Sequence, residues 1–117
     1  MVAGVDKNGP HLFETCPSGN YYEYFAYSIG ARSQSARTYL EDHLSEFENS
    51  TLDELILHSL AALRKSASDE GELKGKSVEI GVVGVDHKFT LLNEEQITTY
   101  LAQLKDFKGS GAMEVEQ

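Results

Sequence analysis

Histidines and a single cysteine are the residues of this 117-residue chain whose chemistry could serve a metal site or a nucleophile. The four histidines are His11, His43, His58 and His87. They fall on separate expected elements, and none has a second ligand residue at a spacing typical of zinc sites. This spacing predicts ordinary surface or boundary histidines, with no bound metal and no cofactor.

Cys16, Gly81 and Gly84 are the next candidates, for a nucleophile and for a phosphate loop. Cys16 ends an expected strand without a basic residue nearby in sequence to activate its sulfur, which indicates a small, half-buried apolar residue. The two glycines do not precede a helix, so they do not form a phosphate loop. They instead indicate places where another group packs closely on a strand.

Charged residues gather on an expected helix that begins near Ser33. One side of this helix is acidic, which predicts a solvated face, and carries Glu41, Asp42, Glu46 and Glu48. Arg32 and Arg37 bracket the start of the helix. Two interpretations of these arginines stay open. They form ion pairs across a subunit interface, or they are solvent-exposed charges that contribute little to stability.

The overall charge excludes some classes of partner. The chain carries 19 acidic and 10 basic residues, a net charge of -9, which argues against binding to nucleic acid and to an anionic membrane. A single cysteine cannot form an internal disulfide, so a reducing compartment is expected. The N-terminus lacks the pattern of a signal peptide, and no apolar run approaches the ~20 residues of a membrane span. A cytoplasmic and nuclear location is therefore expected.

The first part of the chain predicts an antiparallel meander of strands at residues 2–5, 10–16 and 21–29. The sequences DKNG at residues 6–9 and PSGN at residues 17–20 are typical of tight turns. The aromatic residues of the third strand suit a pleated, half-buried surface.

A pair of helices follows, and turn and capping signals set their ends. Gly30 ends the third strand, Ser33 is the expected N-cap of the first helix, and that helix ends at Asn49. Thr51, with Glu54 three residues later, predicts a capping box. The short connection makes the helices antiparallel neighbours. The second helix has a broad apolar stripe of Leu52, Leu55, Ile56, Leu60 and Leu63.

A near-continuous apolar run at residues 78–85 predicts a strand that is covered on both faces. A strand at residues 89–92 and a last helix capped by Asn93 complete the pattern. This order predicts an α+β fold, with helices on one face of a mostly antiparallel sheet. Residues 1–107 are expected to form one domain, and residues 108–117 a flexible acidic tail. These elements cannot cover both faces of the apolar strand, which indicates a missing layer.

Residues 28–41, SIGARSQSARTYLE, combine a strand end, a glycine turn and the first turns of a helix. This stretch resembles the signature of proteasome alpha-type subunits. Residues 9–12, GPHL, and 16–21, CPSGNY, resemble the strands and turn that precede the signature in that family. Residues 78–84, VEIGVVG, resemble its late hairpin. The resemblance extends over residues 2–104.

The resemblance implies part of a four-layer αββα sandwich, the N-terminal-nucleophile hydrolase fold, with this chain as the C-terminal half. It implies a structural subunit of the outer alpha ring of the 20S proteasome, which supports ring assembly and gated access in ubiquitin-dependent protein breakdown. The implied partners are other alpha-type subunits, beta-ring subunits and regulatory particles that bind the assembled ring. The implied structural and interface residues are Gly30, Arg32, Ser33, Gln34, Arg37 and Tyr39.

The resemblance also implies a subunit without catalytic residues. The related beta subunits use an N-terminal threonine as nucleophile and base, whereas this chain starts with Met1 and Val2. At the glycine-serine-glycine-serine turn of beta subunits, Ala31 stands in place of a serine and Arg32 in place of a glycine. The arginine-aspartate-x-x-serine-glycine element of beta subunits is not found around residues 64–75.

Other functions stay open. A threonine-type amidohydrolase would need processing that exposes an N-terminal threonine, and Thr15, inside an expected strand, is the early candidate. A stand-alone small interaction domain built from the same elements would fold alone as a cooperative unit. A fragment of a larger fold would instead expose apolar sheet surface.

Overall fold

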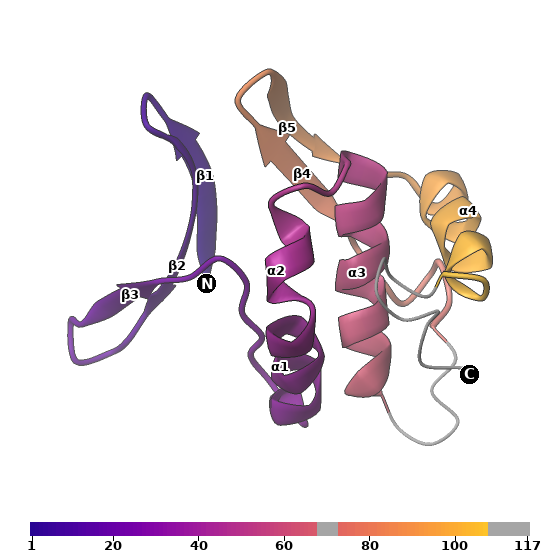
Figure 1. Cartoon of the computed structure of the whole chain (residues 1–117), viewed down its shortest axis with the longest axis horizontal. Coiled ribbons are helices and arrows are strands. Elements are labelled where there is room, and N and C mark those ends of the chain that lie inside the picture. The colour runs from indigo at the N-terminus through magenta and orange to yellow at the C-terminus, as the bar shows by residue number, and fades with distance from the viewer. Residues whose placement is uncertain (68–72, 108–117) are drawn as a thin grey trace.

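Two small antiparallel sheets and a set of helices make up the described part of the chain (Figure 1). The structure is a computed structural model, and it describes residues 1–67 and 73–107. In chain order the elements are β1 (Val2–Asp6), β2 (Gly9–Thr15), β3 (Tyr21–Glu23), α1 (Ser33–Asp42), α2 (Leu44–Phe47), α3 (Leu52–Lys65), β4 (Gly81–Gly84), β5 (His87–Leu91) and α4 (Glu94–Leu104). The tail expected at residues 108–117 lies outside the described residues. Helices with antiparallel strands agree with the expected α+β class.

Strands β1, β2 and β3 form the predicted antiparallel meander. Val2 of β1 lies opposite Phe13 of β2. In the turn between these strands, a side-chain oxygen of Asp6 accepts a hydrogen bond from the backbone N–H of Asn8 at 2.8 Å. Short polar side chains commonly satisfy turn backbones in this way. The predicted turns at residues 6–9 and 17–20 are confirmed.

The third strand is much shorter than predicted. It was expected at residues 21–29 but ends at Glu23, after which the Tyr24 N–H still bonds to the Leu12 carbonyl at 2.9 Å. The rings of Tyr24 and Tyr27 stack with their centroids 4.1 Å apart. Residues three apart in an extended strand point to opposite faces of the sheet. The stack therefore requires a bent chain, which ends the strand.

The first predicted helix is interrupted. α1 ends at Asp42 and α2 begins at Leu44, because His43 between them has φ -110° and ψ 9°, outside the helical region. The apolar positions keep their helical spacing across this break. The sequence pattern therefore could not locate it.

Capping boxes fix the starts of the two longer later helices. At α3, the Thr51 hydroxyl accepts from the Glu54 N–H at 3.2 Å, and the Glu54 carboxylate accepts from the Thr51 N–H at 2.9 Å. Asn93 and Gln96 make the same reciprocal pair at α4. Each pair satisfies backbone N–H groups that the helix itself leaves without partners. The predicted caps Thr51 and Asn93 are confirmed.

Helix α3 is the centre of the core. It lies between α1 on one side and α4 on the other (Figure 1). The hydrogen bond from Arg32, at the start of α1, to the Ser66 carbonyl, at the end of α3, agrees with the predicted antiparallel pairing. Leu60 of α3 is 2% exposed, as is Ile97 of α4, and Leu104 is 3% exposed. The remaining members of this buried cluster are Ile56, Leu57, Ala61, Val78 and Val82. Burial of apolar side chains of α4 and of residues 78–82 against α3 is thus the main apolar contribution to stability.

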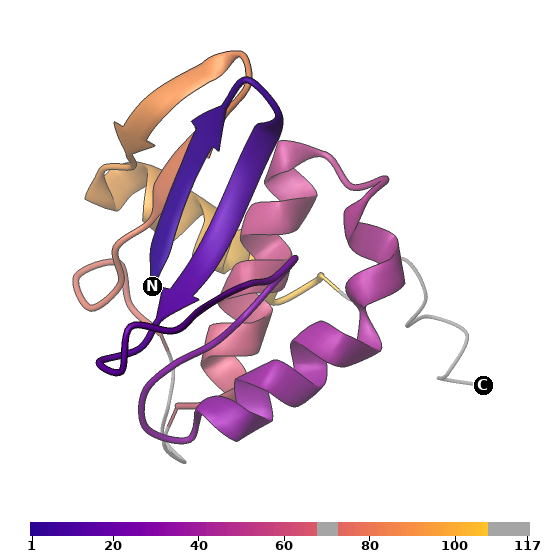
Figure 2. The same ribbon diagram turned by 90° about the vertical axis from the view of Figure 1, so that its left-hand side faces the viewer.

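The strand predicted at residues 78–85 is confirmed only at residues 81–84, as β4, and it pairs with β5 alone. Figure 2 shows the β1–β2 hairpin beside the β4–β5 hairpin, and the two sheets share no ladder. The sequence predicted that the elements of this chain cannot cover both faces of the strand, and the exposures of its residues agree with that prediction. Val82 is buried, but Val85 is 68% exposed. The core of this chain covers one face only.

The close approach expected at the β4 glycines is confirmed for one of them. A Cβ atom on Gly81 would lie 3.0 Å from the Phe89 ring, a separation that real Cβ atoms rarely show. At Gly84 the nearest contact would be an ordinary 3.6 Å. None of the helices in the described ranges is long and apolar enough to cross a membrane.

The capping box of α3 gives a direct test of the local sequence signal. We expect Thr51→Ala to lower the free energy of unfolding by about 1 kcal/mol, because the Glu54 backbone N–H loses the hydroxyl that accepts its hydrogen bond. Urea unfolding monitored by circular dichroism measures this change. Ser59→Ala is the matched control on the same helix, since its exposed hydroxyl bonds only to the Leu55 carbonyl. Equal losses in the two variants would contradict the capping role.

Candidate functional site

The turn into α1 contains two residues with positive φ angles. Gly30 has φ +109°, a conformation that L side chains adopt only under strain, and Arg32 follows with φ 55° in the left-handed region. The Ser33 N–H donates to the Gly30 carbonyl at 3.1 Å. This turn reverses the chain within a few residues and points it into the helix. Gly30 thus occupies the turn position predicted for it.

Ser33 was predicted to be the N-cap of α1, and this is wrong. Arg32 occupies the N-cap position without a side-chain cap bond, and Ser33 is the first helical residue. The Ser33 hydroxyl instead accepts a hydrogen bond from Arg37, one turn later, at 3.1 Å. The left-handed backbone of Arg32 replaces the extended backbone that a capping serine needs.

The two arginines at this turn hold chain segments together. Arg37 donates through Nε to the Ser28 carbonyl at 2.9 Å, and its guanidinium lies 4.7 Å from the Tyr27 ring centroid. Arg32 donates through Nε to the Ser66 carbonyl, at the end of α3, at 2.8 Å. Arg32 is exposed and Arg37 half-buried, and both donate hydrogen bonds to backbone carbonyls of other segments, so the interpretation as exposed charges that add little stability stays open. Ion pairing across a subunit interface stays a prediction.

The remaining predicted residues lie apart from this turn. Gln34 is exposed in the first turn of α1, and its backbone carbonyl accepts from the Thr38 hydroxyl at 3.0 Å. Tyr39 lies two turns into the helix and belongs to a different group. The structure thus joins Gly30, Arg32, Ser33 and Arg37 at one turn, with Gln34 on the solvent side and Tyr39 directed at α3.

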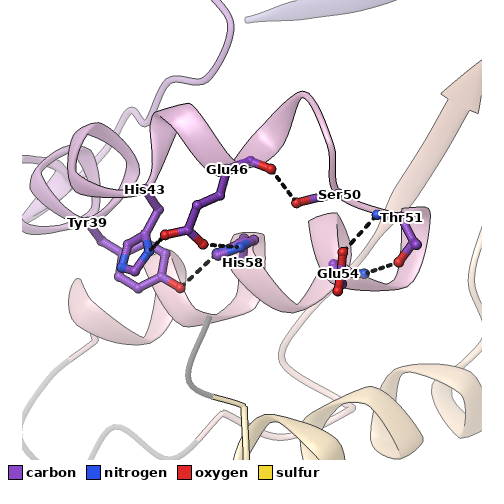
Figure 3. Close-up of polar contacts among 7 residues, drawn as sticks. All are labelled: Tyr39, His43, Glu46, Ser50, Thr51, Glu54 and His58. Atoms are coloured by element: carbon purple, nitrogen blue, oxygen red, sulfur yellow. Dashed lines mark hydrogen bonds and ion pairs between the residues drawn. The ribbon is translucent and has the colours of Figure 1, made fainter. Parts of the chain in front are cut away.

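Tyr39 leads into a cluster of His43, Glu46 and His58, which we call the His/Glu cluster (Figure 3). His43 Nδ1 lies 3.0 Å from one carboxylate oxygen of Glu46, and His58 Nε2 lies 3.5 Å from the other. The Tyr39 hydroxyl is 2.9 Å from His58 Nδ1. The carboxylate thus sits between two imidazoles, one from the α1–α2 break and one from α3.

This cluster is enclosed by rings. The Phe47 and Phe107 rings meet the His58 imidazole edge to face, with centroids 5.0 and 4.9 Å away. The Tyr39 and His43 rings lie 4.2 Å apart. His58 is only 3% exposed. Within the described ranges no buried side-chain nitrogen or oxygen lacks a hydrogen-bond partner.

Burial controls the protonation of the cluster. It lowers the pKa of His58 because the charged imidazolium would lose its hydration, although the nearby Glu46 charge acts in the opposite direction. Burial, with a smaller contribution from Glu46, raises the pKa of Tyr39 to about 12. At neutral pH the cluster therefore holds a neutral His58 beside a protonated Tyr39.

Sequence reasoning missed the His/Glu cluster. Glu46 was assigned to a solvated acidic face, yet its side chain is only 18% exposed. No histidine was expected to have a ligand residue at a sequence spacing typical of zinc sites, and the fold brings His43 and His58 together with Glu46 without such a spacing. The available signals were the three-residue spacing of His43 and Glu46 and the place of His58 among the apolar residues of α3.

A second histidine pairs with carboxylates on the meander. His11 Nδ1 lies 2.5 Å from a Glu23 oxygen, and His11 Nε2 lies 2.9 Å from an Asp6 oxygen. The hydrogen bonds to Glu23 and Asp6 raise the pKa of His11. The two carboxylates lie on opposite edges of the ring, so they clamp the histidine between neighbouring strands. His87 is exposed and bonds only to the Lys88 carbonyl among the described contacts.

The candidate nucleophiles are poorly placed for catalysis. Thr15 is exposed at the end of β2, opposite Tyr21. Cys16 is half-buried, as predicted. Neither residue has a hydrogen bond to a histidine or carboxylate in the described contacts, whereas an activated nucleophile needs a base within reach.

An apolar face of α3 and the sheets is left open. Three of the five residues of the predicted α3 stripe are exposed, with Leu52 at 44%, Leu55 at 36% and Leu63 at 43%. These side chains line a groove of about 390 Å³ together with residues 78–83 and Ala3 of β1. Contiguous exposed apolar surface of this kind marks a place for a partner or for another part of a fold.

Comparison with known proteins gives consistent matches. Residues 1–83 match the proteasome subunit family. Proteasome subunit alpha type-1 of Dictyostelium discoideum is 47% identical over 107 residues, 91% of this chain and 43% of that protein. The probable proteasome subunit alpha type-6 of Schizosaccharomyces pombe is 46% identical over 112 residues, 96% of this chain and 41% of that protein. Proteasome subunit alpha type-1 of Caenorhabditis elegans is 45% identical over 104 residues, 89% of this chain and 40% of that protein. The chain thus spans about two fifths of the length of these relatives.

The strained turn predicts a loss of stability in Gly30→Ala. A side chain at φ +109° is expected to lower the free energy of unfolding by about 1–3 kcal/mol. Urea unfolding measures the loss. Gly4→Ala in β1 is the control, because an added Cβ meets nothing within 4 Å and Gly4 lacks a positive φ. A loss no larger than that of the control would show that the turn tolerates a side chain.

The clamp on His11 predicts a pH-dependent hairpin. Because the pKa of His11 is raised in the folded chain, its charged form stabilises the meander. The contribution is fully present below the ordinary pKa of 6.5 and is lost as the pH rises through the raised pKa. NMR titration of the imidazole protons should give a pKa above 6.5 for His11, and Glu23→Gln should lower it. The exposed His87 serves as the internal reference. A His11 pKa that does not respond to Glu23→Gln would contradict the clamp.

Proposed function

The chain belongs to the proteasome subunit family, and on that basis we propose that it is a non-catalytic, structural part of an alpha-type subunit in the outer ring of the 20S core. The relatives named above carry alpha-type names, which supports the alpha class. The observation that carries a structural role is the open apolar face of α3 and the sheets. Such a face gains stability only when another part of the assembly covers it.

The proposed setting is the four-layer αββα sandwich, of which this chain supplies later strands and one helical layer. Helices α1, α3 and α4 lie to one side of the strands (Figure 1). Leu55 and Leu63 border the groove between α3 and residues 78–83, where a further layer would bury them. Further strands would also pair with the short edges of β3 and β5.

At the turn into α1, the proposed role of the candidate residues is to present a rigid surface to ring neighbours. Arg32 is exposed, and its Nε–H donates to the Ser66 carbonyl. This bond fixes the position of the guanidinium, whose other N–H donors are then available to a partner. Gln34 is exposed beside it. A preset backbone lowers the entropy lost when a surface binds a partner. Neighbouring alpha-type and beta-ring subunits are the proposed partners.

The proposal assigns no catalytic residue. Ala31 supplies no hydroxyl at the turn, and the Thr15 amine is held in a peptide bond inside β2. Exposing Thr15 as an N-terminal residue would remove β1 and most of β2, and with them the meander. The proposed contribution is therefore to an assembled ring that gates proteolysis elsewhere, in ubiquitin-dependent breakdown in the cytoplasm and nucleus, where regulatory particles bind.

A stand-alone interaction domain is the second candidate, and the buried cluster around α3 favours it. Leu60, Ile97 and Leu104 are each 2–3% exposed, so α3 and α4 pack tightly within this chain. The Tyr100 hydroxyl also donates to Asp53 across the two helices at 2.7 Å. Cooperative urea unfolding of the isolated chain would support this candidate.

The deciding measurement is the intact mass and binding partners of this protein purified from its natural source. We expect a complex that contains other alpha-type and beta-type subunits, because the open apolar face requires cover. The isolated chain should bind a hydrophobic dye, and it should aggregate as its concentration rises. A free species of 12.9 kDa that unfolds cooperatively and without dye binding would contradict the ring proposal.

A further inference from the structure

The His/Glu cluster has the composition and shape of a metal site. We propose that His43, Glu46 and His58 bind one divalent transition-metal ion of the zinc class. Imidazole nitrogens and a carboxylate oxygen are common zinc ligands, and three protein ligands leave a fourth position for water. This proposal concerns a site of the chain itself and does not rest on the ring function.

The donor atoms already lie close to ligand positions. In a tetrahedral zinc site, with bonds of about 2.0–2.1 Å, neighbouring ligand atoms are about 3.3 Å apart. His43 Nδ1 lies 3.0 Å from one carboxylate oxygen of Glu46, and His58 Nε2 lies 3.5 Å from the other oxygen. One donor atom from each of the three side chains lies within 4.8 Å of the others. Small side-chain movements would therefore complete the ligand set.

The donors converge on one point, unlike those around His11. Glu46 stands between the two imidazoles, so a single ion could reach all three side chains (Figure 3). Around His11, the Glu23 and Asp6 carboxylates bond to opposite ring nitrogens, 2.5 and 2.9 Å away. One ion cannot reach both of those carboxylates through the ring. The His11 group therefore serves as a natural control.

The contacts around the ligands fix their orientation. Metal-bound histidines usually use their second ring nitrogen in a hydrogen bond that orients the ring. The Tyr39 hydroxyl, 2.9 Å from His58 Nδ1, would accept that N–H and leave the Nε2 lone pair for the ion. Phe47 and Phe107 hold the same ring from its sides. The ligand on α3 is thus positioned before any ion arrives.

The exposure of the His/Glu cluster determines the side from which an ion can enter it. The side chains of His43 and Glu46 are each 18% exposed, so an ion can enter from their side, while His58 forms the buried end. Binding at His43 Nδ1 would require the hydrogen between this nitrogen and Glu46 to leave, either to Nε2 of the same ring or to solvent. An ion bound there would join the break between α1 and α2 to the middle of α3.

Isothermal titration of the whole chain with Zn²⁺ tests the proposal. We expect one equivalent to bind and the thermal midpoint of unfolding to rise with Zn²⁺ concentration. Glu46→Gln keeps the shape of the side chain but removes its charge. Because a ligand is lost, Zn²⁺ binding should weaken by more than the roughly 10–100-fold that typically follows the loss of a hydrogen bond to a ligand. Tyr39→Phe should weaken binding by about 10–100-fold, because only the orientation of His58 is lost.

Control variants separate this site from other histidines. His11→Gln and His87→Gln should leave Zn²⁺ affinity unchanged, whereas His43→Gln should abolish tight binding. Circular dichroism establishes that each variant is folded, and if His58→Gln fails to fold, His43→Gln and Glu46→Gln decide the outcome. Absence of binding to the wild-type chain, or binding that survives both of these substitutions or depends on His11, would overturn the proposal.

Discussion

The packing of α3 against its neighbours is the interaction on which the rest of the described structure depends. The lowest exposures in the chain include Leu60 of α3 and Ile97 of α4, which lie in one buried cluster with Val78 and Val82. α1 and α4 flank α3 on opposite sides (Figure 1). Each of these elements has one apolar face, and α3 gives each of them a surface to bury it against. The positions of the helix start and of the His/Glu cluster therefore follow from where α3 lies.

The same helix also explains why the chain has an open surface. Its apolar stripe is wider than the surface that this chain supplies, so Leu52, Leu55 and Leu63 remain partly exposed beside the groove. A helix that is apolar around more than one face is typical of an element between two layers. This agrees with a chain that spans about two fifths of the length of its relatives. The open surface of α3 is the observation on which the proposed structural role rests.

Polar contacts connect α3 to α1 at two places. Arg32 donates to the carbonyl of Ser66, the C-cap of α3, and the buried His58 contacts both Tyr39 and Glu46. A buried imidazole is costly unless both of its nitrogens have partners, and here they do. These contacts set the direction of α1 relative to α3. They also make the surface near Arg32 rigid, which suits a structural role in an assembly.

The sequence by itself determined the features that depend on neighbouring residues. The capping boxes at Thr51 and Asn93, the turn at Gly30 and the antiparallel meander depend on interactions within a few positions, which local patterns report directly. The family resemblance, carried by ordered blocks of residues, was confirmed by the comparisons. Helix order and the packing of α1 against α3 followed from apolar spacing and a short connection.

Only the tertiary structure decided the features that join distant residues. The His/Glu cluster unites positions 43, 46 and 58, and the early end of β3 depends on the stack of Tyr24 on Tyr27. The Ser33 cap failed because Arg32 adopts a left-handed backbone. Periodicity reports which face of an element is apolar, but it does not report which side chain of another element meets that face. The fold therefore buries His58 and half-buries Glu46, although the sequence indicated a surface or boundary histidine and a solvated acidic face.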